Sequence, residues 1–114
     1  MFSVKTRLRF IKSAISNFSN VETDHWAKQL DEYVKINHAK IIIKGITTSI
    51  NLQNELNSNI VNETINEDVH FVFIMPNPKN MYINSELVKN LCFLKKNLNS
   101  VVPKCIEKEV KEEV

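Results

Sequence analysis

The chain has 114 residues, 43% of them hydrophobic, which suits one domain that buries its own core. Its net charge of +2 is too small by itself to indicate a nucleic-acid binder, and its two cysteines are too few for a metal cluster or a disulfide framework. The single glycine, Gly45, argues against glycine-rich phosphate-binding loops, and no stretch reaches the roughly 20 apolar residues of a membrane span.

The first twenty residues, MFSVKTRLRFIKSAISNFSN, contain basic side chains and no acid. Apolar residues recur there at helical spacing: Val4, Leu8, Ile11, Ile15 and Phe18. A strand also fits, because apolar and basic residues alternate nearby, but we favour the helix since its spacing runs longer. The segment suits a mitochondrial presequence, a phosphate-contacting arm or the first element of the fold. We interpret residues 1–21 as a retained, amphipathic docking segment.

A second helix is predicted over residues 22–37, ETDHWAKQLDEYVKIN, with Thr23 or Asp24 as its cap. The consecutive isoleucines at 41–43 then predict a short strand buried on both faces, with Gly45 at its end. A helix followed directly by such a strand indicates α/β layering rather than an all-α bundle.

Residues 47–67 are rich in asparagine and favour no single structure. The spacing of Leu52, Leu56 and Ile60 supports a helix weakly, and an insertion or a long loop fits equally well.

The stretch VHFVFIMPNPKNMYIN predicts a β-hairpin whose turn is PNPKN. A helix should follow over residues 85–98, SELVKNLCFLKKNL, with Ser85 as its N-cap. Beyond Pro103 we expect a charged tail that is extended or loosely helical.

Few residues suggest a catalytic or metal-binding role. The spacing of His25, His38 and His70 matches no metal motif, and surface or packing roles suit them better. Cys92 falls within an apolar helical pattern, which indicates a buried, inert thiol. The sequence therefore predicts no catalytic residue, no metal and no cofactor.

The basic side chains are the more suggestive feature, because lysine and arginine contact phosphates without reading a base sequence. A solvated polar face fits them equally well. The residues that we select as contacts to RNA or to a partner protein are Lys5, Arg7, Arg9, Lys12, Lys40, Lys44, Lys95 and Lys96.

Two long stretches carry a family resemblance. DHWAKQLDEYVKINHAKIIIKG looks like the helix-to-strand portion of a thioredoxin-like family, and VHFVFIMPNPKNMYINSELVKNLCFLKKNL is similar to its hairpin-to-helix portion. That family contains mitochondrial ribosomal proteins and a small accessory subunit of respiratory complex I. The resemblance implies an α/β, thioredoxin-like fold: a small mixed sheet with a β-hairpin and flanking helices. No Cys-x-x-Cys is present, so thioredoxin redox chemistry is not implied.

The resemblance further implies a non-catalytic structural subunit of a mitochondrial ribosome, located in the matrix. Its partners would be rRNA and neighbouring subunits, with no small-molecule substrate. The docking segment, an α/β core over residues 22–102 and a charged tail over 103–114 would be its parts. An accessory subunit of complex I and a small free-standing RNA-binding protein are the alternatives, followed by a small enzyme.

Overall fold

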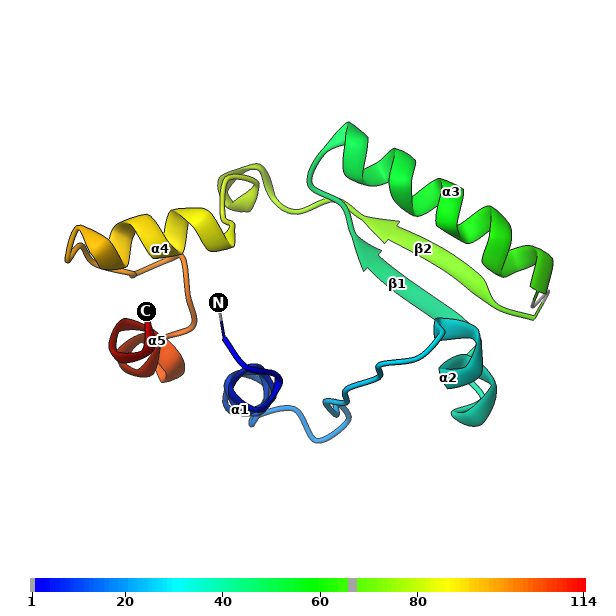
Figure 1. The fold of residues 1–114 in the computed structure, drawn as a ribbon, viewed down its shortest axis with the longest axis horizontal. Coiled ribbons are helices and arrows are strands. Elements are labelled where there is room, and N and C mark those ends of the chain that lie inside the picture. Colours follow the sequence, from blue (N-terminus) through cyan, green and yellow to red (C-terminus); the bar gives the residue numbers. More distant parts are fainter. Residues whose placement is uncertain (1, 66–67) are drawn as a thin grey trace. The chain divides into compact units, whose positions relative to one another are not determined.

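The computed structural model describes residues 2–65 and 68–114, with side chains for all of these except 59–65. The chain divides into two compact units, Met1–His25 with Tyr82–Val114, and Trp26–Met81. The predicted α/β class is confirmed, because a small parallel sheet occurs together with flanking helices (Figure 1). The finer thioredoxin-like arrangement is not confirmed.

The unit Trp26–Met81 is built on a strand–helix–strand motif. Its elements are α2 (Leu30–Ile36), β1 (Ile41–Gly45), α3 (Ser49–Ile65) and β2 (His70–Ile74). The strands pair in parallel, in a register that runs from Ile41 opposite His70 to Gly45 opposite Ile74. Parallel neighbours need a long crossover connection, and α3 supplies it, lying along one face of the sheet (Figure 1).

The two faces of this sheet differ in exposure, because alternate residues of a strand point to opposite sides. Half-buried side chains occupy the face toward α3: Ile42, Lys44, Phe71 and Phe73. Exposed apolar side chains occupy the other, which we call the open face: Ile41, Ile43, Val72 and Ile74. The predicted burial of residues 41–43 on both faces is therefore wrong for the described part of the chain, where one face is covered.

The predicted hairpin is also wrong. Residues Pro78–Asn80 form a short 3-10 helix, η1, in place of a returning strand. Asn77 Oδ1 accepts a hydrogen bond from the Lys79 N–H at 3.2 Å, which caps this turn. Proline has no N–H to donate and a fixed φ that suits the start of a helix, so the turn ends β2 without reversing it. Because no strand returns after β2, the described sheet consists of the parallel pair β1 and β2 and is not mixed.

Within the described residues the asparagine-rich stretch forms the helix α3, so the long-loop alternative is wrong. Thr48 Oγ1 accepts a hydrogen bond from the Asn51 N–H at 3.0 Å, as an N-capping side chain does. The side chain of Ile60, part of the predicted stripe, lies outside the described residues, as do Asn66 and Glu67. The preceding helix, α2, is shorter than predicted and begins at Leu30.

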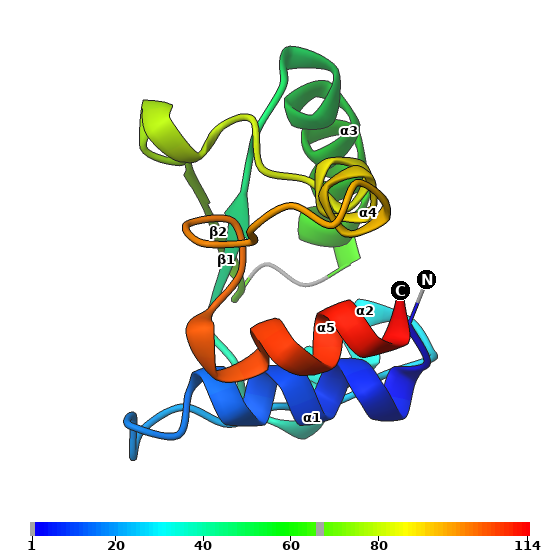
Figure 2. The same cartoon turned by 90° about the vertical axis from the view of Figure 1, so that its left-hand side faces the viewer.

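The other unit contains α1 (Val4–Ala14), α4 (Ser85–Phe93), η2 (Lys104–Ile106) and α5 (Glu107–Glu113) (Figure 2). The helix prediction for the first segment is confirmed. Its buried residue is Phe10, however, while Ile11 and Phe18 of the predicted stripe are exposed. The N-cap of α4 is Asn84 rather than Ser85, because Asn84 Oδ1 accepts from the Leu87 N–H at 2.8 Å. The core of this unit consists of Phe10, Val88, Leu98, Ile106 and Val110.

Helices α1 and α5 lie side by side, so the charged tail is helical and packed (Figure 2). Arg9 Nη2 lies 2.7 Å from Glu109 Oε2 and 2.8 Å from Glu113 Oε1. The hydrogen bond to Glu113 and the charge of Glu109 raise the pKa of Arg9. These groups are solvated, so we expect only a modest contribution to stability that salt weakens.

The pH dependence of stability should include a contribution from Glu107. Lys111 Nζ donates a hydrogen bond to Glu107 Oε1 at 2.6 Å, and this contact lowers the pKa of the Glu107 carboxyl. A carboxyl whose folded-state pKa is depressed stabilises the fold above its unfolded-state pKa. That stability is lost as the pH falls through the folded-state pKa.

Replacing Glu107 by Gln should therefore lower the denaturation midpoint at neutral pH and reduce the difference between neutral and strongly acid pH. Glu112→Gln is the matched control, because its Lys108 partner is 3.9 Å away and both side chains are largely exposed. Equal effects of the two variants on the pH profile would contradict the assignment.

Among residues 2–65 and 68–114, no helix combines the length and the apolar character that crossing a membrane requires. Cys92 is a half-buried free thiol and Cys105 an exposed one.

Candidate functional site at the ends of the parallel strands

The carboxyl ends of β1 and β2 meet at one edge of the sheet. Gly45 and Ile74 are paired there, and the Ile46 N–H donates to the Ile74 carbonyl at 3.0 Å just beyond them. Ligands of open parallel α/β sheets bind outside the carboxyl ends of the strands. This edge is therefore where a small-molecule site is expected.

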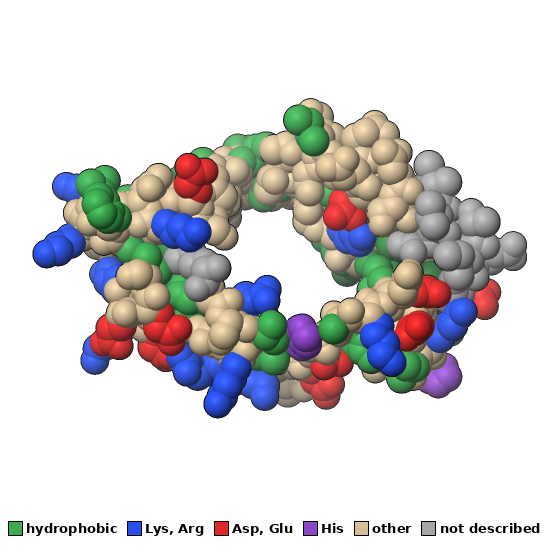
Figure 3. All heavy atoms as spheres, viewed as in Figure 1, with side chains coloured by type: hydrophobic (Ala, Val, Ile, Leu, Met, Phe, Trp, Pro, Cys, Tyr) green, Lys and Arg blue, Asp and Glu red, His purple; other side chains and the backbone are tan. Residues whose placement is uncertain are grey.

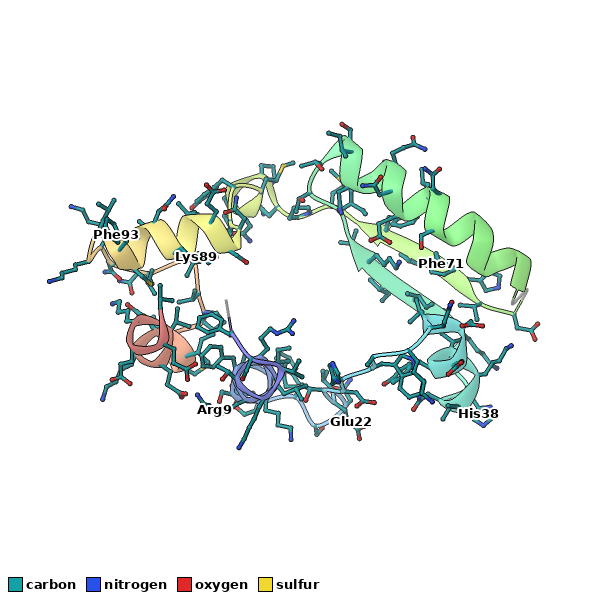
Figure 4. The ribbon with its side chains drawn as sticks, in the orientation of Figure 1. Arg9, Glu22, His38, Phe71, Lys89 and Phe93 are labelled. Carbon is teal, nitrogen blue, oxygen red and sulfur yellow. The ribbon has the colours of Figure 1, made fainter. Side chains whose placement is uncertain are left out.

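Lys44 places a positive charge at that edge. Strand alternation turns its side chain toward α3, where Nζ forms an ion pair with Glu55 Oε2. Nζ also lies 5.6 Å from the centre of the Phe71 ring, which Figure 4 shows on β2. The Lys44 and Glu55 side chains are 22% and 29% exposed, so this ammonium is partly desolvated yet reachable from solvent. A partly desolvated ammonium interacts more strongly with a charged partner than a fully hydrated one does, and Glu55 is the partner here.

The backbone next to Lys44 is not crowded. A Cβ built on Gly45 would meet no atom within 4 Å, so close packing does not require glycine at this position. Thr47 and Thr48 follow in the loop that leads into α3. The edge thus offers hydroxyl groups and one partly buried cation, while the space beside Gly45 lies on the face opposite to the Lys44 side chain.

Sequence reasoning selected Lys44 as a contact residue but missed Glu55. The missing signal was the secondary structure of residues 47–67. In the structure a helix begins at Ser49, and it carries Glu55 to within ion-pair distance of Lys44. A loop over the same residues would not have predicted the position of Glu55.

The other basic residue selected in this unit is Lys40, which lies at the opposite, amino-terminal end of β1. It lines a shallow pocket with His38 and Asp68. Lys40 and Lys44 are therefore at opposite ends of one strand rather than in one cluster.

The remaining selected residues belong to the other unit. Lys5, Arg7, Arg9 and Lys12 are exposed on α1, where basic and acidic side chains lie beside each other over α1 and α5 (Figure 3). Lys95 and Lys96 follow α4 and line a cavity of about 630 Å³ together with Lys111. Arg9 forms ion pairs with Glu109 and Glu113. A role of these residues in contacting RNA or a partner protein stays a prediction.

A second cavity in the same unit, of about 560 Å³, is mainly apolar. Its polar lining consists of Arg7, the α4 N-cap Asn84 and the first residue of α4, Ser85. An arginine beside a helix N-terminus suits an anion that carries an apolar portion.

In the part of the chain that the structure describes, no group of three or more His, Cys, Asp or Glu side chains could hold a metal ion. His25, His38 and His70 are all exposed, in line with the surface roles predicted for them.

Comparison with known proteins decides between the possible families. No family model matches the chain. It is 31% identical to the phosphopantetheine adenylyltransferase of Caldanaerobacter subterraneus subsp. tengcongensis over 112 residues, which cover 98% of this chain and 70% of that protein. The chain belongs to the phosphopantetheine adenylyltransferase family. It is also 30% identical to the Clostridium botulinum (strain 657) member over 114 residues, and 30% identical to the Helicobacter pylori (strain Shi470) member over 104 residues.

Membership of this family overturns the functional predictions. The resemblance to mitochondrial ribosomal and complex I proteins is wrong, because the relatives consistently carry the name of an enzyme. The predicted non-catalytic subunit and its rRNA and ribosomal partners are wrong for the same reason. The predicted absence of a small-molecule substrate is also wrong, since the adenylyltransferases are named for one. The predicted mitochondrial matrix location is wrong as well, because these relatives come from bacteria.

Proposed function

We propose that this protein acts in the transfer of an adenylyl group to phosphopantetheine, and that it binds a phosphate group of a substrate at the carboxyl ends of β1 and β2. Family membership supports the reaction. The partly buried Lys44 ammonium at the edge of a parallel sheet is the observation that supports the place.

The chemistry of the reaction suits such a group. With adenosine triphosphate as donor, a phosphate oxygen of phosphopantetheine forms a bond to the α-phosphorus, and the bond from that phosphorus to pyrophosphate breaks. Negative charge is present on both reactants throughout, so catalysis depends on positioning and on fixed positive charge. Lys44 is a compact cation for phosphate, and Glu55 holds it in place when no anion is bound.

The test is the binding of phosphopantetheine to the purified chain, measured by calorimetry. Lys44→Met removes the charge and keeps the length of the side chain, and should weaken binding about tenfold or more, since hydrogen bonds to charged groups contribute about 1.5–3 kcal/mol. Lys40→Met is the matched control and should leave the affinity unchanged, because Lys40 directly precedes β1 at its amino-terminal end.

Absence of phosphopantetheine binding to the unmodified chain would contradict the proposed function. Equal losses in the Lys44 and Lys40 variants would contradict the proposed place, because they would indicate attraction by net charge alone.

A further inference from the structure

The cavity of about 630 Å³ beside the end of α4 belongs to the unit that does not contain the sheet. Its charged lining consists of Lys95 and Lys96, which follow α4, and of Glu107 and Lys111 on α5. We call it the lysine cavity. Its volume lies within the range of about 300–1,000 Å³ that is typical of small-molecule sites.

The lining of the lysine cavity carries an excess of positive charge. Lys111 Nζ donates a hydrogen bond to Glu107 Oε1 at 2.6 Å, so this ammonium and this carboxylate neutralise each other. In the part of the chain that the structure describes, no acidic side chain pairs with Lys95 or Lys96. Two positive charges therefore remain, and a phosphate monoester at neutral pH carries about 1.5 to 2 negative charges.

Lys95 occupies a backbone position that does not favour lysine. Its φ is 52°, in the left-handed region where glycine is the usual residue after a helix. The Lys95 N–H donates to the Cys92 carbonyl at 3.0 Å and the Lys96 N–H to the Leu91 carbonyl at 2.8 Å, which closes the last turn of α4. The dipole of α4 favours a cation here, but Lys96 already supplies one without a positive φ. Neither the turn nor the dipole thus explains a lysine at position 95.

We propose that the lysine cavity binds a small organic molecule through its phosphate group, which the Lys95 and Lys96 ammonium groups hold. Asn97 Oδ1 already accepts a hydrogen bond from the Asn99 N–H at 2.8 Å, so the Asn97 Nδ2 group serves as a further donor. Lys111 keeps the Glu107 carboxylate from repelling the ligand. This site is separate from the proposed substrate site, because Lys44 belongs to the other unit.

The size of the cavity favours an organic phosphate over the free ion. A phosphate group fills only a small part of a cavity of about 630 Å³, which leaves room for the portion of the molecule that carries it. We therefore expect sn-glycerol 3-phosphate, a simple organic phosphate, to bind more tightly than inorganic phosphate does.

The two cysteines allow a direct test with the purified chain. Cys92 lines the cavity as a half-buried free thiol, whereas Cys105 is an exposed thiol outside the lining. The chain is treated with N-ethylmaleimide, an uncharged reagent, and mass spectrometry measures the reaction of each thiol. Glycerol 3-phosphate should slow the reaction of Cys92 in a saturable manner and leave that of Cys105 unchanged.

Three substitutions locate the contact. Lys95→Gly and Lys96→Met should each raise the concentration of glycerol 3-phosphate that half-protects Cys92 about tenfold or more, since each removes a charged hydrogen bond. Lys108→Met is the matched control, because Lys108 on α5 is 89% exposed and lies outside the lining. Lys95→Gly should not lower the urea midpoint, because glycine adopts a φ of 52° without steric cost.

Four results would overturn the proposal. They are no slowing at Cys92 beyond that of sodium chloride at equal ionic strength, equal slowing at Cys105, equal shifts in the Lys96 and Lys108 variants, and equal protection by inorganic phosphate. The last would assign the cavity to the free ion. Lys44→Met should leave the protection of Cys92 unchanged, so failure here and failure of the proposed function are distinguishable.

Discussion

Leu98→Ala should lower the free energy of unfolding by about 2–5 kcal/mol, the range measured when a buried leucine leaves a cavity in a packed core. Leu98 is 0% exposed and packs with Phe10, Val88, Ile106 and Val110. Its loss removes contacts to α1, α4 and the C-terminal helices at once. Urea denaturation followed by circular dichroism measures the change.

Leu94→Ala is the matched control, since Leu94 lies four residues earlier and is 60% exposed. The control should change stability by about 0.5 kcal/mol or less. Similar losses in the two variants would mean that Leu98 is not the centre of this core.

Ile46→Ala should destabilise the unit Trp26–Met81 by a comparable amount, about 2–5 kcal/mol. Ile46 is 1% exposed and follows β1 directly, and its N–H bonds to the end of β2. The single tryptophan, Trp26, belongs to this unit and stacks edge-on against Tyr33 with ring centres 5.3 Å apart. Its fluorescence during denaturation therefore reports on the unit that contains the substitution.

The same substitution at Ile50 serves as the comparison, because that side chain is 74% exposed. The prediction fails if Ile50→Ala lowers the midpoint of the tryptophan transition as much as Ile46→Ala does.

The mistaken resemblance to a thioredoxin-like family came from one segment, residues 47–67, whose structure the sequence did not reveal. The order helix, strand, unreadable stretch, strand and helix is shared by many α/β folds, so it could not distinguish among them. Reading residues 47–67 as a helix would have turned the two strands into a parallel βαβ unit and moved the search for a site to its carboxyl edge. Asparagine is only a middling helix former, so it did not favour a helix here. The cap of this helix comes from Thr48, whose Oγ1 accepts from the Asn51 N–H, and local spacing does not reveal it.

The basic N-terminal segment shows a different limit of local sequence patterns, since the structure pairs one of its basic residues with distant acids. Its lack of nearby acids indicated an external anionic partner. Glu109 and Glu113 are about a hundred positions away in sequence, yet they pair with Arg9 in the folded unit. A local window cannot show such a pair, even though the opposite charges of the two ends were visible.

The sequence alone determined the α/β class, the helix over the first segment, the strand at the isoleucines and the helix after residue 84. Each of these depends on local periodicity, capping and turn chemistry, which short windows contain. Only the tertiary structure decided that β1 and β2 are parallel neighbours, that Lys44 meets Glu55, and that one face of the sheet is open. These features depend on contacts between distant segments, whose free energy no local pattern records.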